Sequence, residues 1–202
     1  MSQDPDGYRV PAGVGEAVRV EKRSRFLALA APVFTAVEAQ ELVEARRRQY
    51  HDAAHHGYAF RVGDAERSSD DGEPSGTAGK PILAAIHATG LESVAVVVTR
   101  YFGGVKLGPG GLVRAYGEAA RDALAKAGQE ERFHTGGVVV TFDFELTSPV
   151  HHVMQKFDAH TVDSSYSERV RLTLELRRSL LAPFKAALLE STAGKVEFSN
   201  ER

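Results

Sequence analysis

A glycine-rich segment, residues 103–111, leads directly into a stretch of helical periodicity and gives the clearest chemical signal in the sequence. Glycines at this place let the backbone turn sharply and leave N–H groups free at the positive end of the helix dipole, which favours a bound anion. Arg100, Lys106 and Arg114 flank the segment and could hold a phosphate of RNA, of a nucleotide or of a phosphoprotein. The spacing lacks the Gly-Lys-Ser/Thr of a Walker loop and therefore argues against nucleotide hydrolysis.

Two aromatic residues, Tyr101 and Phe102, precede the glycines and could stack on a base. The alternative is that the glycines only permit a tight loop, that both rings belong to the core and that the cations are solvated. The predicted site for an anion, RNA or a protein partner comprises His55, Arg100, Tyr101, Lys106, Gly110, Gly111 and Arg114.

A second segment, residues 64–77, is dense in carboxylates. Oxygen ligands at this density could hold magnesium. Apart from this possibility we predict no metal site and no cofactor. Asp70 and Glu73 could instead transfer protons, although the spacing does not match an EF-hand. The residues singled out in this acidic loop are Asp70, Asp71, Glu73, Ser75 and Thr77.

Two structural interpretations of the acidic loop stay open beside the chemical ones. In the first, its Asp and Ser side chains cap turns and Thr77 caps the next helix. In the second, a carboxylate pairs with Arg100 or Lys106, which would make both segments structural.

Two adjacent histidines, His55 and His56, begin an apolar stretch typical of a strand. Neighbouring residues on a strand point to opposite faces, so these two cannot bind one metal ion together. One of them could line a site, while a hydrogen-bonded structural role is the alternative for both. His151 and His152 are expected at the surface.

The elements that must position these residues form an α/β domain over residues 1–133. Residues 1–7 read as a loose polar tail, and residues 63–75 are polar enough to predict a loop. Residues 93–99 are apolar on both faces of a strand and are therefore expected at the centre of a sheet. The predicted strands are 25–29, 56–62 and 93–99, and the predicted helices are 35–50 with a capping box, one from Pro81 to a stop at Gly90, and 112–127.

Residues 134–202 show a different and regular order of elements. Alternating apolar residues predict strands at 138–146 and 170–177, and Ser148 and Ser179 are expected to open helices. Further strands are expected at 161–166 and near Phe198. The resulting βαββαβ order is the ferredoxin-like arrangement, so the whole chain is expected to be α+β with two domains.

Composition restricts the classes of function. With 25 Lys+Arg against 27 Asp+Glu the net charge is -2, so any attraction for nucleic acid must be local. The absence of cysteine excludes disulfides, thiolate zinc sites and thiol nucleophiles, and no apolar run approaches membrane-spanning length. We therefore expect a soluble cytoplasmic protein with no membrane partner, as a monomer or weak oligomer.

Three phrases together closely resemble the hallmark stretches of the YigZ/IMPACT family. They are residues 55–60, the phrase Asp-Asp-Gly-Glu-Pro-Ser-Gly-Thr-Ala-Gly at 70–79, and the phrase Arg-Tyr-Phe-Gly-Gly-Val-Lys-Leu-Gly at 100–108. The whole chain fits the bacterial form of the family, which carries an extra C-terminal module. Gly57 departs from the pattern because many relatives have cysteine there, which argues against a required thiol.

The resemblance implies a first domain with the fold of the second domain of ribosomal protein S-five, including a left-handed βαβ crossover, and a C-terminal module similar to the ferredoxin-like domain of elongation factor G. It also implies a link to translation, since eukaryotic IMPACT proteins restrain a starvation-responsive kinase by competing for its activator. Fold alone does not assign an activity to a bacterial member.

Three functional hypotheses follow from the residues and the resemblance. The first is binding to RNA, the ribosome or a translation-associated protein. The second is an enzyme that acts on a phosphorylated or nucleotide-like substrate with magnesium. The third is an adaptor that binds only proteins.

Overall fold

The computed structural model describes residues 4–199, which divide into two compact units. One unit comprises Tyr8–Arg132, and the other comprises Phe133 onward together with the residues before Tyr8. The N-terminal unit contains β2 (Gly15–Glu21), β3 (Ser24–Pro32), α1 (Ala36–Gln49), β4 (His55–Val62), β5 (Ala65–Ser69), α2 (Gly79–Thr89), β6 (Val94–Tyr101) and α3 (Gly108–Ala127). In addition, β1 (Gly7–Val10) and β7 (Glu130–Phe133) form a two-stranded sheet.

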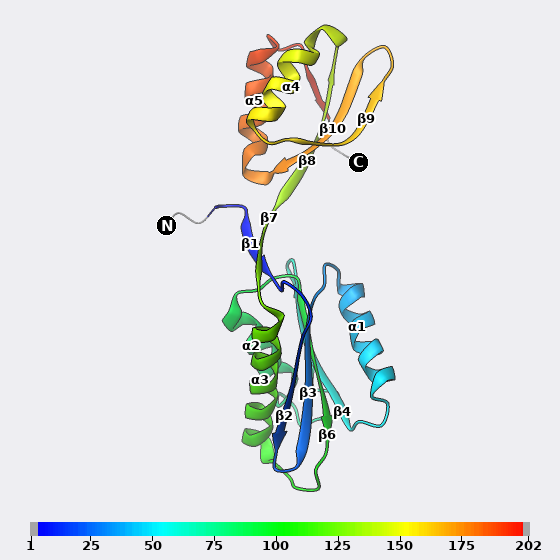
Figure 1. Ribbon diagram of the computed structural model, residues 1–202, viewed down its shortest axis with the longest axis vertical. Helices are drawn as coiled ribbons and strands as arrows, with labels where there is room; N and C mark the ends of the chain where they lie inside the picture. Colours follow the sequence, from blue (N-terminus) through cyan, green and yellow to red (C-terminus); the bar gives the residue numbers. More distant parts are fainter. Residues whose placement is uncertain (1–3, 200–202) are drawn as a thin grey trace. The chain divides into compact units, whose positions relative to one another are not determined.

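A five-stranded sheet of order β2-β3-β6-β4-β5 forms the middle layer of the N-terminal unit. Helix α1 covers one face and helices α2 and α3 cover the other (Figure 1). As predicted, the apolar strand β6 is central, and its five residues from Val94 to Val98 are at most 1% exposed. Strands β3 and β4 both pair antiparallel with β6, so they run parallel to each other and α1 links them across it.

The predicted capping box of α1 is present. Thr35 Oγ1 accepts a hydrogen bond from Glu38 N at 3.1 Å, while Glu38 Oε2 accepts one from Phe34 N at 2.8 Å. Helix α2 ends at Gly90 with φ 66°, the left-handed conformation predicted for its stop signal.

One expectation in the N-terminal unit is wrong, and strand β2 lies in a segment for which no element was predicted. Strand β5 lies within the segment expected to be a loop, because its polar residues form an edge strand that pairs with β4 and is exposed to solvent. The sequence of β2 gives no sign of a core strand, because its buried positions are the small residues Gly15 and Ala17, while Val18 and Val20 face solvent and are each 63% exposed.

The C-terminal unit has the predicted ferredoxin-like fold. It contains β8 (Thr135–Phe142), η1 (Phe144–Leu146), α4 (Thr147–Lys156), β9 (His160–Tyr166), β10 (Val170–Arg177), η2 (Arg178–Leu180), α5 (Leu181–Ser191) and β11 (Glu197–Ser199). The sheet order β11-β8-β10-β9 is antiparallel throughout. Its core lies under α4 and α5 and includes Phe142, Leu174 and Phe184, all fully buried.

Three local expectations for the second unit and its N-terminal segment are corrected. Phe144 and Leu146 belong to a 3₁₀ turn rather than to the preceding strand. Neither Ser148 nor Ser179 caps a helix, since α4 and α5 begin without a side-chain cap. Ser179 donates instead to Asp6, so the described part of the expected tail is fixed to this unit, and residues 1–3 lie outside the described range.

No helix in residues 4–199 is long and apolar enough to cross a membrane.

Candidate functional site

The three motif segments converge on one group of side chains in the N-terminal unit. His55 begins β4 and lies opposite Arg100 in the β4–β6 pairing, so both side chains point to the face covered by α2 and α3. Glu73, from the turn before α2, reaches the same place. Its Oε1 accepts hydrogen bonds from Arg100 Nη1 at 2.6 Å and from the Tyr116 hydroxyl at 2.8 Å.

The salt bridge between the acidic loop and Arg100 is therefore confirmed. The two side chains are only 6% and 3% exposed, so Arg100 is not the surface phosphate contact that we expected. Its guanidinium lies 5.6 Å from the centre of the Phe26 ring and 5.5 Å from that of Phe102, and it donates to Ser24 Oγ at 3.5 Å. Arg100 thus joins the ends of β3, β6 and the acidic loop.

The partner of His55 determines its tautomer. Nδ1 lies 2.8 Å from the Asp71 carbonyl oxygen, which can only accept a hydrogen bond, so Nδ1 carries the proton. In the neutral ring Nε2 then presents a lone pair, and it lies 4.0 Å from Glu73 Oε2, beyond hydrogen-bond distance. His55 therefore offers an acceptor or a base next to a buried carboxylate.

Tyr116 completes this group as a permanent donor. Burial, and then the neighbouring Glu73 carboxylate, raise the pKa of Tyr116 far above its usual value. Its hydroxyl is therefore protonated near neutral pH, where it donates to Glu73 and orients that carboxylate.

Asp70 organises the acidic loop through backbone contacts. Its carboxylate accepts hydrogen bonds from the N–H groups of Gly76, Ala78 and Gly79 at 2.7, 2.9 and 2.8 Å. It therefore caps the start of α2, the role that we expected of Thr77. Thr77 is buried and donates to the Pro74 carbonyl instead, and Ser75 is exposed.

Asp71 ties the same loop to the opposite face of the sheet. Its Oδ1 accepts from Arg47 Nη2 at 2.5 Å and its Oδ2 from the backbone N–H of His56 at 2.6 Å. Each carboxylate of the acidic loop thus accepts hydrogen bonds from its own set of donors within the protein, and this holds for Asp70, Asp71 and Glu73. Across residues 4–199 no group of three or more His, Asp or Glu side chains is placed to hold a metal ion.

Removing the Asp70 carboxylate should destabilise the fold and change its response to acid. Burial acts to raise the pKa of Asp70, but the three N–H donors and Lys80 outweigh it, so the net shift is downward. The pKa of Asp70 is lower in the folded than in the unfolded chain. The ionised carboxylate therefore stabilises the fold above about pH 4, and this stabilisation is lost as pH falls through the folded pKa.

We expect Asp70→Asn to lower the free energy of unfolding by about 1–3 kcal/mol at pH 7. N–H donors approach both oxygens of the Asp70 carboxylate, whereas an amide has only one oxygen that can accept. The difference from wild type should shrink below about pH 4. Urea unfolding at a series of pH values measures both effects. A stability difference that is constant with pH would refute this role.

The predicted glycine-rich segment splits between a loop and a helix. Helix α3 begins at Gly108, two residues before Gly110, so Gly110 and Gly111 form its first turn rather than a preceding loop. Gly103 packs so closely that an added Cβ would lie 2.1 Å from the Arg23 backbone, and its N–H donates to Ser24 Oγ at 3.2 Å. The loop is thereby held against the β2–β3 turn.

A cavity of ≈ 400 Å³ opens above the Glu73–Arg100 pair. His55 and the buried ion pair meet apolar walls, and Lys106 with the start of α3 completes the lining. We call this cavity the His55 pocket; its remaining lining residues are Pro74, Phe102, Leu107, Pro109 and Leu112. It combines a mostly apolar lining with a few convergent polar groups, as small-ligand sites do.

Four exposed cations surround the N-terminus of α3. Lys106 lines the His55 pocket, while Arg114 and Lys22 line a neighbouring hollow together with Gly111. Glu21 and Glu118 also line this hollow, and Glu118 is paired with Arg19 at 2.5 Å. Arg23 follows Lys22 in the β2–β3 turn that packs on Gly103. We call Lys22, Arg23, Lys106 and Arg114 the basic rim. Sequence reasoning missed the first two, because their turn is brought to the site only by the pairing of β3 with β6.

Other predicted residues do not belong to the site. Tyr101 follows Arg100 on β6 and points to the α1 face, where its hydroxyl donates to Asp52 at 2.7 Å. His56 is buried on that face with Nδ1 3.0 Å from Thr99 Oγ1, and burial lowers its pKa despite the opposing effect of Asp71. The two histidines therefore point to opposite faces as predicted, and His56 has the structural role.

Gly57 occupies the position at which many related sequences carry cysteine. An added Cβ would lie 2.8 Å from Ala78 Cβ and 3.2 Å from Tyr116 Cε1. The side chains of Ala78 and Tyr116 fill the space that a cysteine side chain would need, so this site contains no thiol.

The profile of the Impact N-terminal domain matches residues 22–124, and that of a Domain of unknown function (DUF1949) matches residues 140–195. A protein of Thermus thermophilus described as an IMPACT family member in pol 5' region is 44% identical over 155 residues, covering 77% of this chain and 85% of that protein. The Escherichia coli IMPACT family member YigZ is 32% identical over 197 residues, covering 95% and 97%. A crystal structure of a hypothetical protein superposes with TM-score 0.74 at 31% identity, covering 98% of each chain.

Proposed function

The chain belongs to the IMPACT family, and from that premise we propose that its basic rim binds RNA of the translation apparatus, on the ribosome in the cytoplasm. The observation that carries this proposal is the gathering of four exposed cations around the start of α3 in a chain whose net charge is -2. A local positive field of this kind attracts a polyanion that the molecule as a whole does not.

RNA suits this surface for two further reasons. Phe102, beside the rim, is 53% exposed, and a solvated aromatic ring next to cations is a stacking platform for an unpaired base. The first N–H groups of α3 face the same region and favour a phosphate by hydrogen bonding and by the helix dipole. Regulation of translation through this contact is the biological role that we propose.

The double variant Lys106→Ala/Arg114→Ala tests the proposal. We expect affinity for purified ribosomes and for a single-stranded RNA to fall about tenfold or more at low salt, because two phosphate contacts are removed. Fluorescence anisotropy with labelled RNA measures this loss. Arg100 is excluded from the variant, because its removal would unfold the site rather than discharge the surface.

The matched control is Arg121→Ala/Lys126→Ala, which removes two exposed cations of the same unit in the second half of α3, away from the rim. We expect it to bind like wild type. If both double variants lose affinity equally, binding follows net charge rather than the rim, and the proposal fails.

A second candidate function rests on the His55 pocket. The free Nε2 of His55 beside Glu73 could accept a proton from a small phosphorylated or nucleotide-like substrate, with magnesium arriving on its phosphates. A ligand of the folded state raises the unfolding temperature, so a nucleotide with magnesium should do so in wild type and not in His55→Ala. No shift in wild type across nucleotides would remove this candidate.

A further inference from the structure

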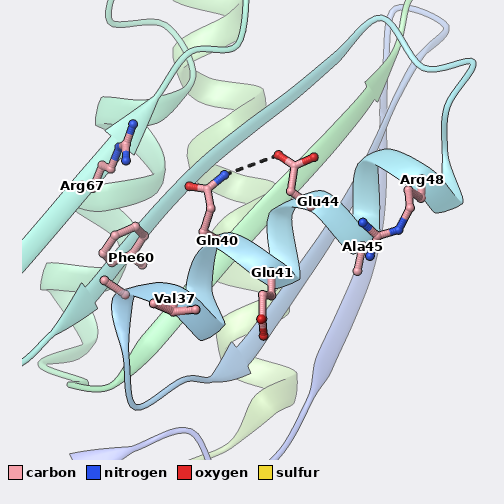
Figure 2. Close-up of a pocket in the computed structure, with 9 residues that line it drawn as sticks. Val37, Gln40, Glu41, Glu44, Ala45, Arg48, Phe60 and Arg67 are labelled. Carbon is pink, nitrogen blue, oxygen red and sulfur yellow. Dashed lines mark hydrogen bonds between the residues drawn. The ribbon is translucent and has the colours of Figure 1, made fainter.

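A groove separates α1 from the edge strand β5, on the face of the sheet away from the His55 pocket. It encloses ≈ 830 Å³ and lies beside Val37, Gln40 and Glu44 of α1 and Arg67 of β5 (Figure 2). Phe60 of β4 lies between Val37 and Arg67 in this view. Helix α1 therefore leaves the outermost strand of this face uncovered.

The pairing of β4 with β5 explains how the groove is lined. Arg67 lies directly opposite Phe60, so both side chains are on the α1 face. Phe60 is only 4% exposed and forms the floor, whereas Val37 is 66% exposed at the mouth. The groove thus presents apolar surface between Arg67 on the strand and a helix that carries Glu41 and Glu44, with Arg48 towards its end.

One edge of β5 is open. In the five-stranded sheet β5 pairs only with β4, so the backbone groups along its other edge have no strand partner among the described residues. Glu66 is occupied on the opposite face, where His87 and Arg61 contact it at 2.9 and 3.4 Å. Arg67, in contrast, is exposed and has no hydrogen-bond or ion-pair partner within residues 4–199.

From these features we propose that β5 and the groove bind an extended segment of a partner protein, which adds to the sheet as a further strand. Strand addition satisfies the open backbone edge, and alternate side chains of the segment point into the groove. The segment carries an acidic residue facing Arg67 and, two positions away on the same face, a large apolar residue that packs over Ala65 or Ser69 at the side of the groove.

The charges also argue against a second copy of this chain as the occupant. A symmetric antiparallel pairing of two β5 strands centred on Arg67 would place two arginines opposite each other, which is destabilising. The short, charged edge likewise disfavours indiscriminate pairing, so it selects a partner of complementary charge.

The test uses a phage-displayed library of random dodecapeptides selected on the full chain. We expect an enriched pattern with an acidic residue two positions from an aliphatic or aromatic one. A synthetic peptide of that pattern should bind wild type and lose at least tenfold in affinity for Arg67→Glu. Replacing its acidic residue by Lys should restore binding to Arg67→Glu.

Arg171→Glu is the control, because Arg171 is an exposed strand arginine of the C-terminal unit; it should bind the peptide like wild type. Amide exchange should show new protection in residues 65–69 when the peptide binds. The proposal is overturned if no peptide is enriched, if Arg67→Glu binds the peptide unchanged, if protection falls elsewhere, or if Arg67→Glu dissociates a wild-type dimer. These outcomes are independent of RNA binding at the basic rim.

Discussion

Replacing Glu73 by Ala is expected to lower the free energy of unfolding by about 3–5 kcal/mol. The variant leaves the buried Arg100 guanidinium without its counter-charge and the Tyr116 hydroxyl without its acceptor. An unpaired buried charge costs more than the loss of one hydrogen bond, so the effect should exceed that of any surface substitution. Urea unfolding followed by circular dichroism measures it.

A double-mutant cycle separates the ion pair from general loss of packing. Arg100→Met alone should cost a similar amount, while Glu73→Leu combined with Arg100→Met should be much less destabilised than the sum of the single variants. Strictly additive losses would show that the two charges do not stabilise each other and would contradict the assigned core of the site.

The second large effect is expected at Gly15, where β2 packs on α3. A Cβ at this position would lie 2.1 Å from Ala123 O and 2.3 Å from Ala127 N, both backbone atoms of α3. Gly15→Ala must therefore push the helix from the sheet, and we expect a loss of about 3 kcal/mol or more.

Gly13→Ala is the matched control for this prediction. It lies two residues away, nothing within 4 Å would meet its Cβ, and its stability should stay within about 0.5 kcal/mol of wild type. Thermal unfolding of the two variants side by side gives the comparison. Similar behaviour of both would mean that β2 does not pack on α3 as described.

The sequence predicts elements well where burial is one-sided or complete. Alternation identifies Val170–Arg177, the apolar run identifies β6, and Thr35 with Glu38 identifies the start of α1. Polar edge strands give no such signal, so β5 was mistaken for a loop. Alternation also extended β8 too far, because Phe144 and Leu146 continue its spacing of two in the sequence although they lie in a 3₁₀ turn, where Phe144 is 51% exposed and Leu146 packs on the core.

Individual roles at the site were harder to predict than its location. All three motif segments do meet there, but the sequence left open whether Arg100 binds a phosphate or pairs with the acidic loop, and only the fold brings Glu73 against it from 27 residues away. Asp70 caps α2 from eight and nine residues before the N–H groups it binds, beyond any local capping rule. The contribution of the β2–β3 turn to the rim is likewise a matter of tertiary structure.

The salt dependence of RNA binding tests the central claim most directly. For single-stranded RNA, log K should fall with log[salt] by about 0.7 for each phosphate that the protein neutralises. We therefore predict that Lys106→Ala/Arg114→Ala lowers the magnitude of the wild-type slope by about 1.4, whereas Arg121→Ala/Lys126→Ala leaves it unchanged. A wild-type chain without salt-dependent binding, or equal slopes in all three proteins, would contradict the assignment of the basic rim as an RNA-binding surface.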